Sequence, residues 1–385
     1  MKNFEFYNPT KIIFGKDQIH KLSNEVPQGA KVLMVYGGGS IFKNGIYNKI
    51  KAALDGFAVL EFGGVEANPY YETLLKAVEI IKKEKIDFLL AVGGGSVIDG
   101  VKFIAATAVY DGNPLDIFYR KHRPTKAFPF GTVLTLPATG SEMNSGSVVS
   151  RKETQEKLSF GSDYTFPKFS FCDPTVITSL PKKQIQNGVI DAFSHVLEQY
   201  LTYKHEAILQ DKMAESILKT LIEVGPKVAD NPNDYTLASN FMWSCTMALN
   251  GLISKGVPTD WVTHMIGHEL TALYGIDHAR TLAIIFPSLY RVMFESKKEK
   301  LTQLGKEVFG LTGSDNQIAE NAIIELEKFF HLMGMKTKIS ENTSEDISDT
   351  ADFIVNRFKE RGISVMGEKQ NITLDKVKEI VLLSY

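Results

Sequence analysis

The chain has little of what marks several large classes of protein. Its 385 residues include only two cysteines, Cys172 and Cys245, which stand in unlike contexts and give neither a disulfide framework nor a thiolate metal motif. No apolar run approaches the roughly twenty residues needed to span a bilayer, and residues 1–6 lack the basic-then-apolar order of a secretory signal. The formal net charge is −2 without a basic stripe, which excludes the usual electrostatic footprint of nucleic-acid or membrane binding. We therefore expect a protein of the reducing cytoplasm with no nucleic-acid or membrane partner.

In its first half the chain alternates short β-rich runs with helical stretches. Each run is bounded by Gly, Pro or Asn, as expected of strands. The four runs are Lys31–Tyr36, Ala58–Phe62, Asp87–Val92 and Thr132–Leu136. Residues 71–85 and 98–110, between the runs, have the periodicity of helices. Near-continuous apolar strands are typical of a parallel sheet covered on both faces, so this half is predicted to be an α/β, Rossmann-like domain.

The pattern of predicted secondary structure changes after about Pro181. There β-rich runs nearly vanish, and helical stretches follow one another at about 185–203, 206–223, 237–254 and 259–274. The second of these is expected to stop before Gly225-Pro226. We therefore predict two domains, a dinucleotide-binding α/β domain over residues 1–180 and an all-α, metal-binding domain over residues 181–385.

Histidine is scarce, and much of it is concentrated in one region. The chain has eight histidines, and His195, His264, His268 and His278 all fall in its second half. Asp191 and His195 stand one helical turn apart, so both side chains project from one face, and His264 and His268 repeat that spacing. Carboxylate and imidazole are donors that suit zinc or ferrous iron. The pattern predicts a divalent-metal site, and spacing alone does not separate His264 from His268 as a ligand.

Two glycine clusters, Gly37–Ser40 and Gly93–Asp99, follow predicted strands directly. Glycine lets the backbone come close to a ligand. A serine at the start of a helix is expected to cap it, and the N–H groups at that end attract phosphate. A third loop, Thr135–Ser147, also follows a strand and is dense in hydroxyls that suit ribose and pyrophosphate. The carboxyl ends of strands in one parallel sheet are where a nucleotide crevice is expected.

Five ordered motifs together resemble the iron-containing (group III) alcohol dehydrogenase family. They are Asn8–Gly15, Gly93–Asp99, Thr135–Glu142, Asp191–His195 and His264–His278. The resemblance spans essentially the whole chain, and within the family it is strongest with bacterial butanol dehydrogenases and broad-specificity NADPH-dependent aldehyde reductases. It implies a dehydroquinate synthase-like architecture, in which a Rossmann-like domain is followed by a helical one.

The resemblance also implies roles for single residues. One divalent metal, Fe²⁺ or Zn²⁺, would be held by Asp191, His195, His264 and His278, while His268 would lie beside the nicotinamide. His268 is then a candidate proton donor, and His268 and Asp99 are the candidate catalytic residues. The cofactor contacts that the resemblance implies are Asn68, Gly94, Gly95, Ser96, Asp99, Thr135, Thr139 and Ser141, and the residue chemistry adds Gly37, Gly38, Gly39, Ser40 and Lys157 to the expected contacts.

The residue at position 39 bears on the choice of cofactor. Family members that prefer NADH tend to carry an acidic residue there, where it would hold the ribose 2′-hydroxyl. Here Gly38, Gly39 and Ser40 stand instead. Small residues with backbone N–H groups accept a 2′-phosphate that a carboxylate would repel. Lys43 and Lys157 either add positive charge or are solvated surface lysines, and we expect NADP(H) in preference to NAD(H).

The function implied is a metal-dependent oxidoreductase that interconverts primary alcohols and aldehydes such as butanol and butanal, in a homodimer. A glycerol or polyol dehydrogenase and a dehydroquinate-synthase-like lyase are the alternatives of the same architecture, but residues 250–261 supply few charges for a multiply hydroxylated substrate. A metal-dependent hydrolase that uses no nucleotide and a non-catalytic nucleotide-binding protein are the alternatives from other classes.

Overall fold

The computed structural model describes residues 1–385, and its chain divides into two compact units. The sheet unit comprises Tyr7–Pro181 and Asn231–Asn250, and the helical unit comprises Met1–Phe6, Lys182–Asp230 and Gly251–Tyr385. The main division, after Pro181, lies one residue from the boundary predicted at 180/181. Two short segments depart from a simple division in chain order, because residues 1–6 group with the helices and residues 231–250 with the sheet. That the two units fold as separate domains stays a prediction.

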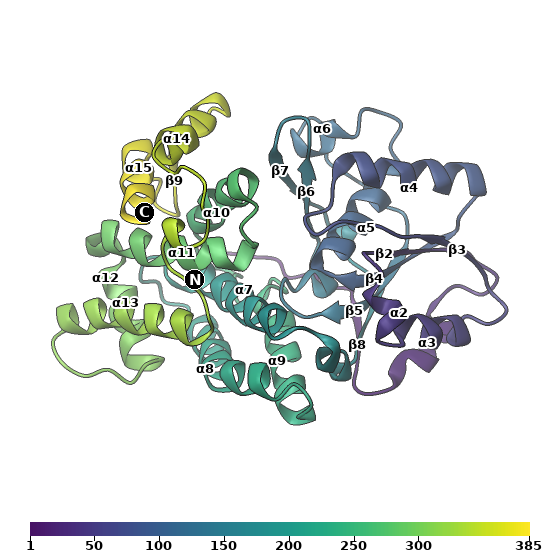
Figure 1. Cartoon of the computed structure of the whole chain (residues 1–385), viewed down its shortest axis with the longest axis horizontal. Helices are drawn as coiled ribbons and strands as arrows, with labels where there is room; N and C mark the ends of the chain where they lie inside the picture. Colours follow the sequence, from purple (N-terminus) through teal and green to yellow (C-terminus); the bar gives the residue numbers. More distant parts are fainter. The chain divides into compact units, whose positions relative to one another are not determined.

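A six-stranded parallel sheet forms the core of the sheet unit (Figure 1), in the order β1-β8-β5-β4-β2-β3. Its strands are β1 (Lys11–Phe14), β2 (Lys31–Tyr36), β3 (Ala58–Phe62), β4 (Phe88–Gly94), β5 (Phe130–Leu136) and β8 (Phe169–Cys172). β4 is buried along nearly its whole length, as the apolar run predicted. The predicted parallel sheet is thus confirmed.

The strand order places the glycine clusters at a topological switch point. In the sheet, β2 lies between β3 and β4. The chain passes from β2 to β3 on one side and from β4 to β5 in the opposite direction. The connections that leave β2 and β4 therefore diverge, and in such sheets this divergence opens a crevice at the carboxyl ends of the strands. Gly37–Ser40 follows β2. Gly94 is the last residue of β4, and Gly95 and Ser96 are the first two residues of α5.

Helices and a hairpin complete the sheet unit. The longer helices are α3 (Ile46–Ala53), α4 (Tyr71–Glu84), α5 (Gly95–Thr107) and α9 (Tyr235–Ala248). The short ones are η1 (Gln18–Lys21), α1 (Leu22–Glu25), α2 (Ser40–Lys43), α6 (Leu115–Phe118), η2 (Ser141–Met143), η3 (Asp163–Thr165) and η4 (Pro174–Ser179). The antiparallel hairpin of β6 (Gly146–Arg151) and β7 (Glu156–Gly161) packs through β6 on α5. Because α5 is covered by both β4 and this hairpin, almost all of its residues are buried.

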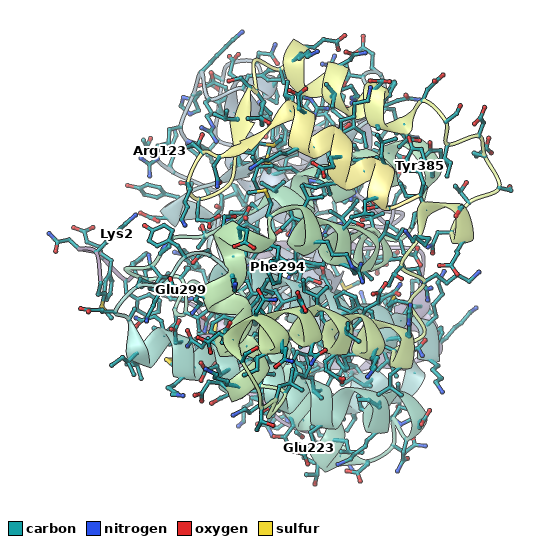
Figure 2. The ribbon with its side chains drawn as sticks, turned by 90° about the vertical axis from the view of Figure 1, so that its left-hand side faces the viewer. Lys2, Arg123, Glu223, Phe294, Glu299 and Tyr385 are labelled. Atoms are coloured by element: carbon teal, nitrogen blue, oxygen red, sulfur yellow. The ribbon has the colours of Figure 1, made fainter.

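The helical unit is built around α7 (Lys182–Tyr200), which packs against α8 (Ile208–Asp230) and α11 (His278–Val292). The other elements are α10 (Val262–Tyr274), α12 (Phe294–Glu307), α13 (Asp315–Leu332), η5 (Ile339–Glu341), α14 (Thr350–Glu360), α15 (Leu374–Leu383) and a small hairpin of β9 (Val365–Met366) and β10 (Ile372–Thr373). In Figure 2, Glu223 of α8 and Glu299 of α12 are exposed side chains, as expected of solvent faces. None of the helices combines the length and the apolar character that crossing a lipid bilayer requires.

The prediction that the second helix stops before Gly225-Pro226 was wrong. α8 continues through both residues to Asp230. Gly225 faces α7, where an added Cβ would lie 2.7 Å from a methyl carbon of Val189. The glycine therefore allows the two helices to approach closely, and this packing outweighs the hydrogen bond that Pro226 cannot donate.

Candidate functional site

Helix α7 carries two of the predicted metal ligands into the interior. Asp191 and His195 are 4% and 5% exposed, so neither side chain is solvated. His195 Nδ1 is buried without a hydrogen-bond partner, and its Nε2 lies 3.8 Å from Asp191 Oδ1, beyond hydrogen-bonding distance. Burial lowers the pKa of His195 to about 4. The ring is therefore neutral at physiological pH, which is the form that binds a metal.

The other two predicted ligands come from α10 and α11. His264 lies in the first turn of α10, and His278 is the first residue of α11. Gly275, at a φ of 65°, ends α10 in the left-handed conformation and lets the chain turn. Asp277 then forms an ion pair with Lys183 (2.7 Å) and accepts a hydrogen bond from Asn187 (3.1 Å), both of α7. The start of α11 is thus tied to the helix that carries Asp191.

The four side chains converge. Ligand atoms of Asp191, His195 and His264 all lie within 4.8 Å of one another. Asp191 Oδ1 is also 3.8 Å from His278 Nε2, and the rings of His264 and His278 are 5.2 Å apart between centroids. Donors bound at about 2.1 Å to one tetrahedral cation lie about 3.4 Å apart. The observed spacing therefore fits a divalent cation after small side-chain adjustments.

His268 lies next to this group, and its ring is as close to His278 as the ring of His264 is. It lies one turn after His264 on α10, and its ring is 6.3 Å from that of His264 and 5.0 Å from that of His278. It is half-buried and is not part of the close set of Asp191, His195 and His264. His278 is not part of that close set either, so the place of His268 beside the nicotinamide stays a prediction.

Two residues to which the sequence pattern assigned no role contact the predicted ligand His264. Glu198, one turn after His195 on α7, accepts a hydrogen bond from His264 Nδ1 at 3.0 Å. Trp261 lies edge-on to the His264 ring at 5.2 Å, and its Nε1–H donates to Thr259 Oγ1 at 3.0 Å. Since the indole N–H is satisfied there, Trp261 presents an apolar surface beside the imidazoles.

On the sheet unit, the loop after β2 has the conformation that only glycine adopts easily. Gly39 has a φ of 93° and precedes α2. The expected serine caps were wrong, because neither Ser40 nor Ser96 caps the helix it opens. Ser40 is the first residue of the four-residue α2. Ser96 Oγ instead accepts a hydrogen bond from the backbone N–H of Asn68 at 3.3 Å, which brings together two predicted cofactor residues.

The N-terminus of α5 is shaped for close backbone approach. The helix runs for 13 residues from Gly95, directly after β4. A Cβ added to Gly95 would lie 2.4 Å from Thr139 Oγ1, so Gly95 and Thr139 are in contact. Backbone N–H groups at the start of such a helix favour phosphate. These residues thus fit the pyrophosphate of a dinucleotide.

Asp99 and Lys102 of α5 hold the third predicted loop in place. Asp99 accepts hydrogen bonds from Ser141 Oγ (2.5 Å) and from the backbone N–H of Val148 (2.9 Å). Lys102 Nζ donates to Ser141 Oγ, Asn144 Oδ1 and the Gly146 carbonyl, each at 2.8 Å. Burial raises the pKa of Asp99 and lowers that of Lys102 to about 8. The Asp99 carboxylate is thus engaged in holding the loop, and Lys102 was missed by sequence analysis.

The remaining predicted cofactor residues lie nearby in the sheet unit. Thr135 is a buried residue of β5, one residue before the strand ends. Lys157 is a half-buried residue of β7, opposite Ser150 in the hairpin, and its charge acts on Asp99 to lower the pKa of that carboxyl.

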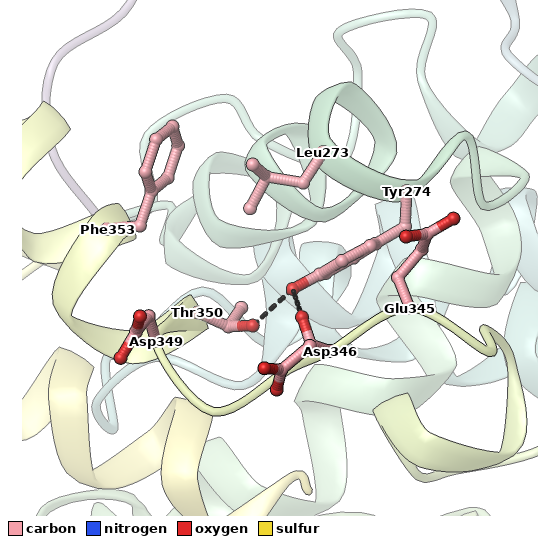
Figure 3. A pocket seen from close by; sticks show the side chains of 7 residues that line it. All are labelled: Leu273, Tyr274, Glu345, Asp346, Asp349, Thr350 and Phe353. Carbon is pink, nitrogen blue, oxygen red and sulfur yellow. Dashed lines mark hydrogen bonds between the residues drawn. The ribbon is translucent and has the colours of Figure 1, made fainter.

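A cavity of about 350 Å³ lies elsewhere in the helical unit (Figure 3), between the end of α10 and the start of α14. It is lined by Leu273, Tyr274, Glu345, Asp346, Asp349, Thr350 and Phe353. The Tyr274 hydroxyl hydrogen-bonds to Thr350 and to the Asp346 carbonyl. No predicted site residue lines this cavity, and its three carboxylates would repel a phosphate.

Comparison with known proteins gives matches over nearly the whole chain. A family described as iron-containing alcohol dehydrogenase matches residues 9–174, and its C-terminal counterpart, the Fe-containing alcohol dehydrogenase family C-terminal model, matches residues 185–383. The chain is 47% identical to the NADPH-dependent aldehyde reductase YqhD of Escherichia coli (strain K12), over 99% of each chain. It is 42% identical to the probable NADH-dependent butanol dehydrogenase 1 of Bacillus subtilis (strain 168), over 100% of each.

Solved structures agree with these matches. The crystal structure of E. coli YqhD superposes with a TM-score of 0.97 at 46% identity, covering 100% of this chain and 99% of that one. The NADH-dependent butanol dehydrogenase A of Thermotoga maritima gives a TM-score of 0.94 at 36% identity, again covering 100% and 99%.

Proposed function

We propose that this chain, which belongs to the iron-containing alcohol dehydrogenase family, interconverts primary alcohols and aldehydes by metal-dependent hydride transfer, with NADPH as the preferred cofactor. The observation that carries the proposal is the convergence of Asp191, His195 and His264 within 4.8 Å, joined by His278. A buried set of one carboxylate and three imidazoles has the composition of a catalytic site for zinc or ferrous iron.

Four residues would hold the metal, which when bound supplies Lewis acidity that polarises a substrate carbonyl. These are Asp191 and His195 of α7, His264 of α10 and His278 of α11, and α11 packs against both α7 and α10. Trp261 offers an apolar surface to the alkyl group of an aldehyde. His268 is the proposed proton donor to the substrate oxygen as hydride reaches the carbonyl carbon.

The sheet unit would bind the dinucleotide. The N-terminus of α5 would hold the pyrophosphate, with Gly94, Gly95, Ser96 and Thr139 near it. Asn68, Thr135, Ser141 and Lys157 are the further proposed contacts. Asp99 takes part by ordering the loop that carries Ser141.

A preference for NADPH is supported by the surroundings of the loop after β2. Gly37, Gly38, Gly39 and Ser40 carry no acid that would repel a 2′-phosphate. On the neighbouring strand β3, Glu61 accepts hydrogen bonds from the hydroxyls of Tyr47 (2.7 Å) and Tyr36 (3.3 Å). The Glu61 carboxylate is therefore already hydrogen-bonded to two tyrosine hydroxyls.

The test is a steady-state assay of butanal reduction with NADPH and NADH in parallel, on protein of measured metal content. We expect turnover with both and a higher kcat/KM with NADPH. A protein that hydrolyses esters or amides, and whose addition leaves NADPH fluorescence unchanged, would instead be the metal-dependent hydrolase. Reduction with NADH alone would contradict the cofactor preference but not the reaction.

We further propose a cytoplasmic homodimer. The N-terminal segment exposes large apolar side chains, with Phe4, Phe6 and Tyr7 at 48%, 46% and 59% exposure. Exposed apolar residues grouped in one segment are typical of a surface that pairs with another chain. Light scattering coupled to size-exclusion chromatography should give twice the chain mass, and a monomer mass would contradict the proposal.

A further inference from the structure

Glu198 lies on the metal-binding face of α7. It follows His195 by one turn and Asp191 by two, so all three side chains project to the same side of the helix. Its Oε2 accepts the hydrogen bond from His264 Nδ1 at 3.0 Å. A carboxylate oxygen is an acceptor, so this contact favours the tautomer with the proton on Nδ1, which leaves Nε2 as the His264 nitrogen that can bind a cation.

The second carboxylate oxygen of Glu198 is held as firmly as the first. Oε1 accepts a hydrogen bond from the backbone N–H of Thr263 at 2.8 Å. The Glu198 carbonyl accepts another from the N–H of Asp260, also at 2.8 Å. Glu198 is 2% exposed, so water does not compete for either oxygen. Three hydrogen bonds to Glu198 thus hold residues 260–264 against α7.

A buried lysine fastens the same segment from the other side. Lys297 of α12 donates to Asp260 Oδ2 (2.7 Å), to Glu368 Oε2 (2.8 Å) and to the carbonyl of Leu201 just beyond α7 (2.9 Å). Asp260 Oδ1 accepts from the N–H of Val262, the first residue of α10. The beginning of α10, and with it His264, is therefore fixed by a continuous set of buried polar contacts.

We infer that Glu198 is a positioning residue for the metal centre: it fixes the tautomer and the orientation of His264, and Asp260 and Lys297 hold the segment on which this contact depends. The inference rests on the proposed function, since it requires that His264 binds the cation. A carboxylate that accepts the second N–H of a ligand histidine also strengthens its donor nitrogen.

The substitution Glu198→Gln tests this with minimal change of shape. Both oxygens of Glu198 accept N–H donors, whereas glutamine has only one acceptor oxygen. The variant must either lose the bond to Thr263 or turn an NH₂ group toward His264 Nδ1, which favours the tautomer that cannot bind metal through Nε2. The matched control is Glu215→Gln. Glu215 is likewise 2% exposed and accepts from Tyr200 (3.0 Å) and Gln303 (2.8 Å), but it touches no metal ligand.

Zn²⁺ affinity is measured by competition with a chromophoric chelator, and the visible spectrum of the Co²⁺-loaded protein is recorded for each variant. We expect Glu198→Gln to bind Zn²⁺ about 10- to 100-fold more weakly than the wild type and to alter the Co²⁺ spectrum. Glu215→Gln should stay within about twofold and keep the wild-type spectrum. Equal affinities of wild type and Glu198→Gln, or equal losses in both variants, overturn the inference while leaving the proposed function intact. A wild type that binds neither cation overturns both.

A second measurement needs no variant, in case Glu198→Gln does not fold. In a crystal structure of the Zn²⁺-loaded wild type, His264 should coordinate through Nε2 and keep Nδ1 on Glu198. Coordination through Nδ1, or a His264 ring turned away from Glu198, overturns the inference.

Discussion

Gly95 and Thr139 are packed so closely that a Cβ on Gly95 would lie 2.4 Å from the Thr139 hydroxyl oxygen. Gly95 opens α5, and Thr139 belongs to the loop after β5, so one close contact joins two parts of the proposed nucleotide site. The absence of a side chain at position 95 is therefore a requirement of the site.

Replacing Gly95 with alanine should displace Thr139 and weaken NADPH binding. The methyl group must displace Thr139 or the start of α5 from the positions proposed to contact the cofactor, and a loss of about 1.4 kcal/mol in binding corresponds to about tenfold in affinity. NADPH fluorescence titration measures the effect. The control is Gly161→Ala at the end of β7, where the nearest atom to the added Cβ is 3.7 Å away. Equal affinities of the Gly95 variant and the wild type would refute the close-approach argument.

Substitutions of the two histidines of α10 should have different effects on metal content and turnover. His264→Asn should lose bound metal, whereas His268→Asn should retain it and lower kcat by about a hundredfold or more. Metal content by mass spectrometry, measured beside kcat, distinguishes the two outcomes. Equal loss of metal in both variants would make His268 a ligand and leave the proton donor unassigned.

Trp261 should contribute more to the binding of longer aldehydes than of short ones. Removing the indole takes away apolar contact worth about 0.8 kcal/mol for each buried methylene. We therefore expect Trp261→Ala to raise KM for butanal by about tenfold and KM for acetaldehyde much less. The other tryptophan, Trp243, is 41% exposed in the sheet unit, and Trp243→Phe is the matched control. A uniform increase of KM for both aldehydes would contradict a role in binding the alkyl group.

Lys102 should make stability rise with pH in the alkaline range. Burial lowers its pKa from 10.5 to about 8, so between these values the unfolded chain holds a proton that the folded chain has released. Stability increases with pH wherever the unfolded state binds more protons. The unfolding free energy of the wild type should therefore rise relative to that of Lys102→Met between pH 8 and 10.5. Urea unfolding at two pH values in this window checks it, and parallel curves would contradict it.

Much of the fold could be predicted because its signals are local. The strands β2 and β3 were predicted at their observed bounds, since continuous Val and Leu runs end at glycines or polar turns. β1 and β8 were missed because each has only four residues, and β1 is an edge strand whose pairing depends on a distant segment. The helix α9 was predicted as a helix, but no local signal could place it with the sheet unit.

The candidate site was likewise predictable only where its residues lie close together in the sequence. Asp191 and His195 could be paired from their spacing, because both lie on one helix. Glu198 has the same helical spacing, yet its partner His264 is 66 positions away, so only the fold brings them together. Lys102 was missed because a lysine within a helix is usually solvated, and here the hairpin and the loop that cover α5 bury it.

The proposed hydride transfer requires the cation that Asp191, His195, His264 and His278 would hold. The most direct measurement follows butanal-dependent NADPH oxidation on protein stripped with a strong chelator, before and after Fe²⁺ or Zn²⁺ is restored. The stripped protein should still bind NADPH, lose nearly all turnover and regain it with the metal. Undiminished turnover by the stripped protein would contradict this requirement.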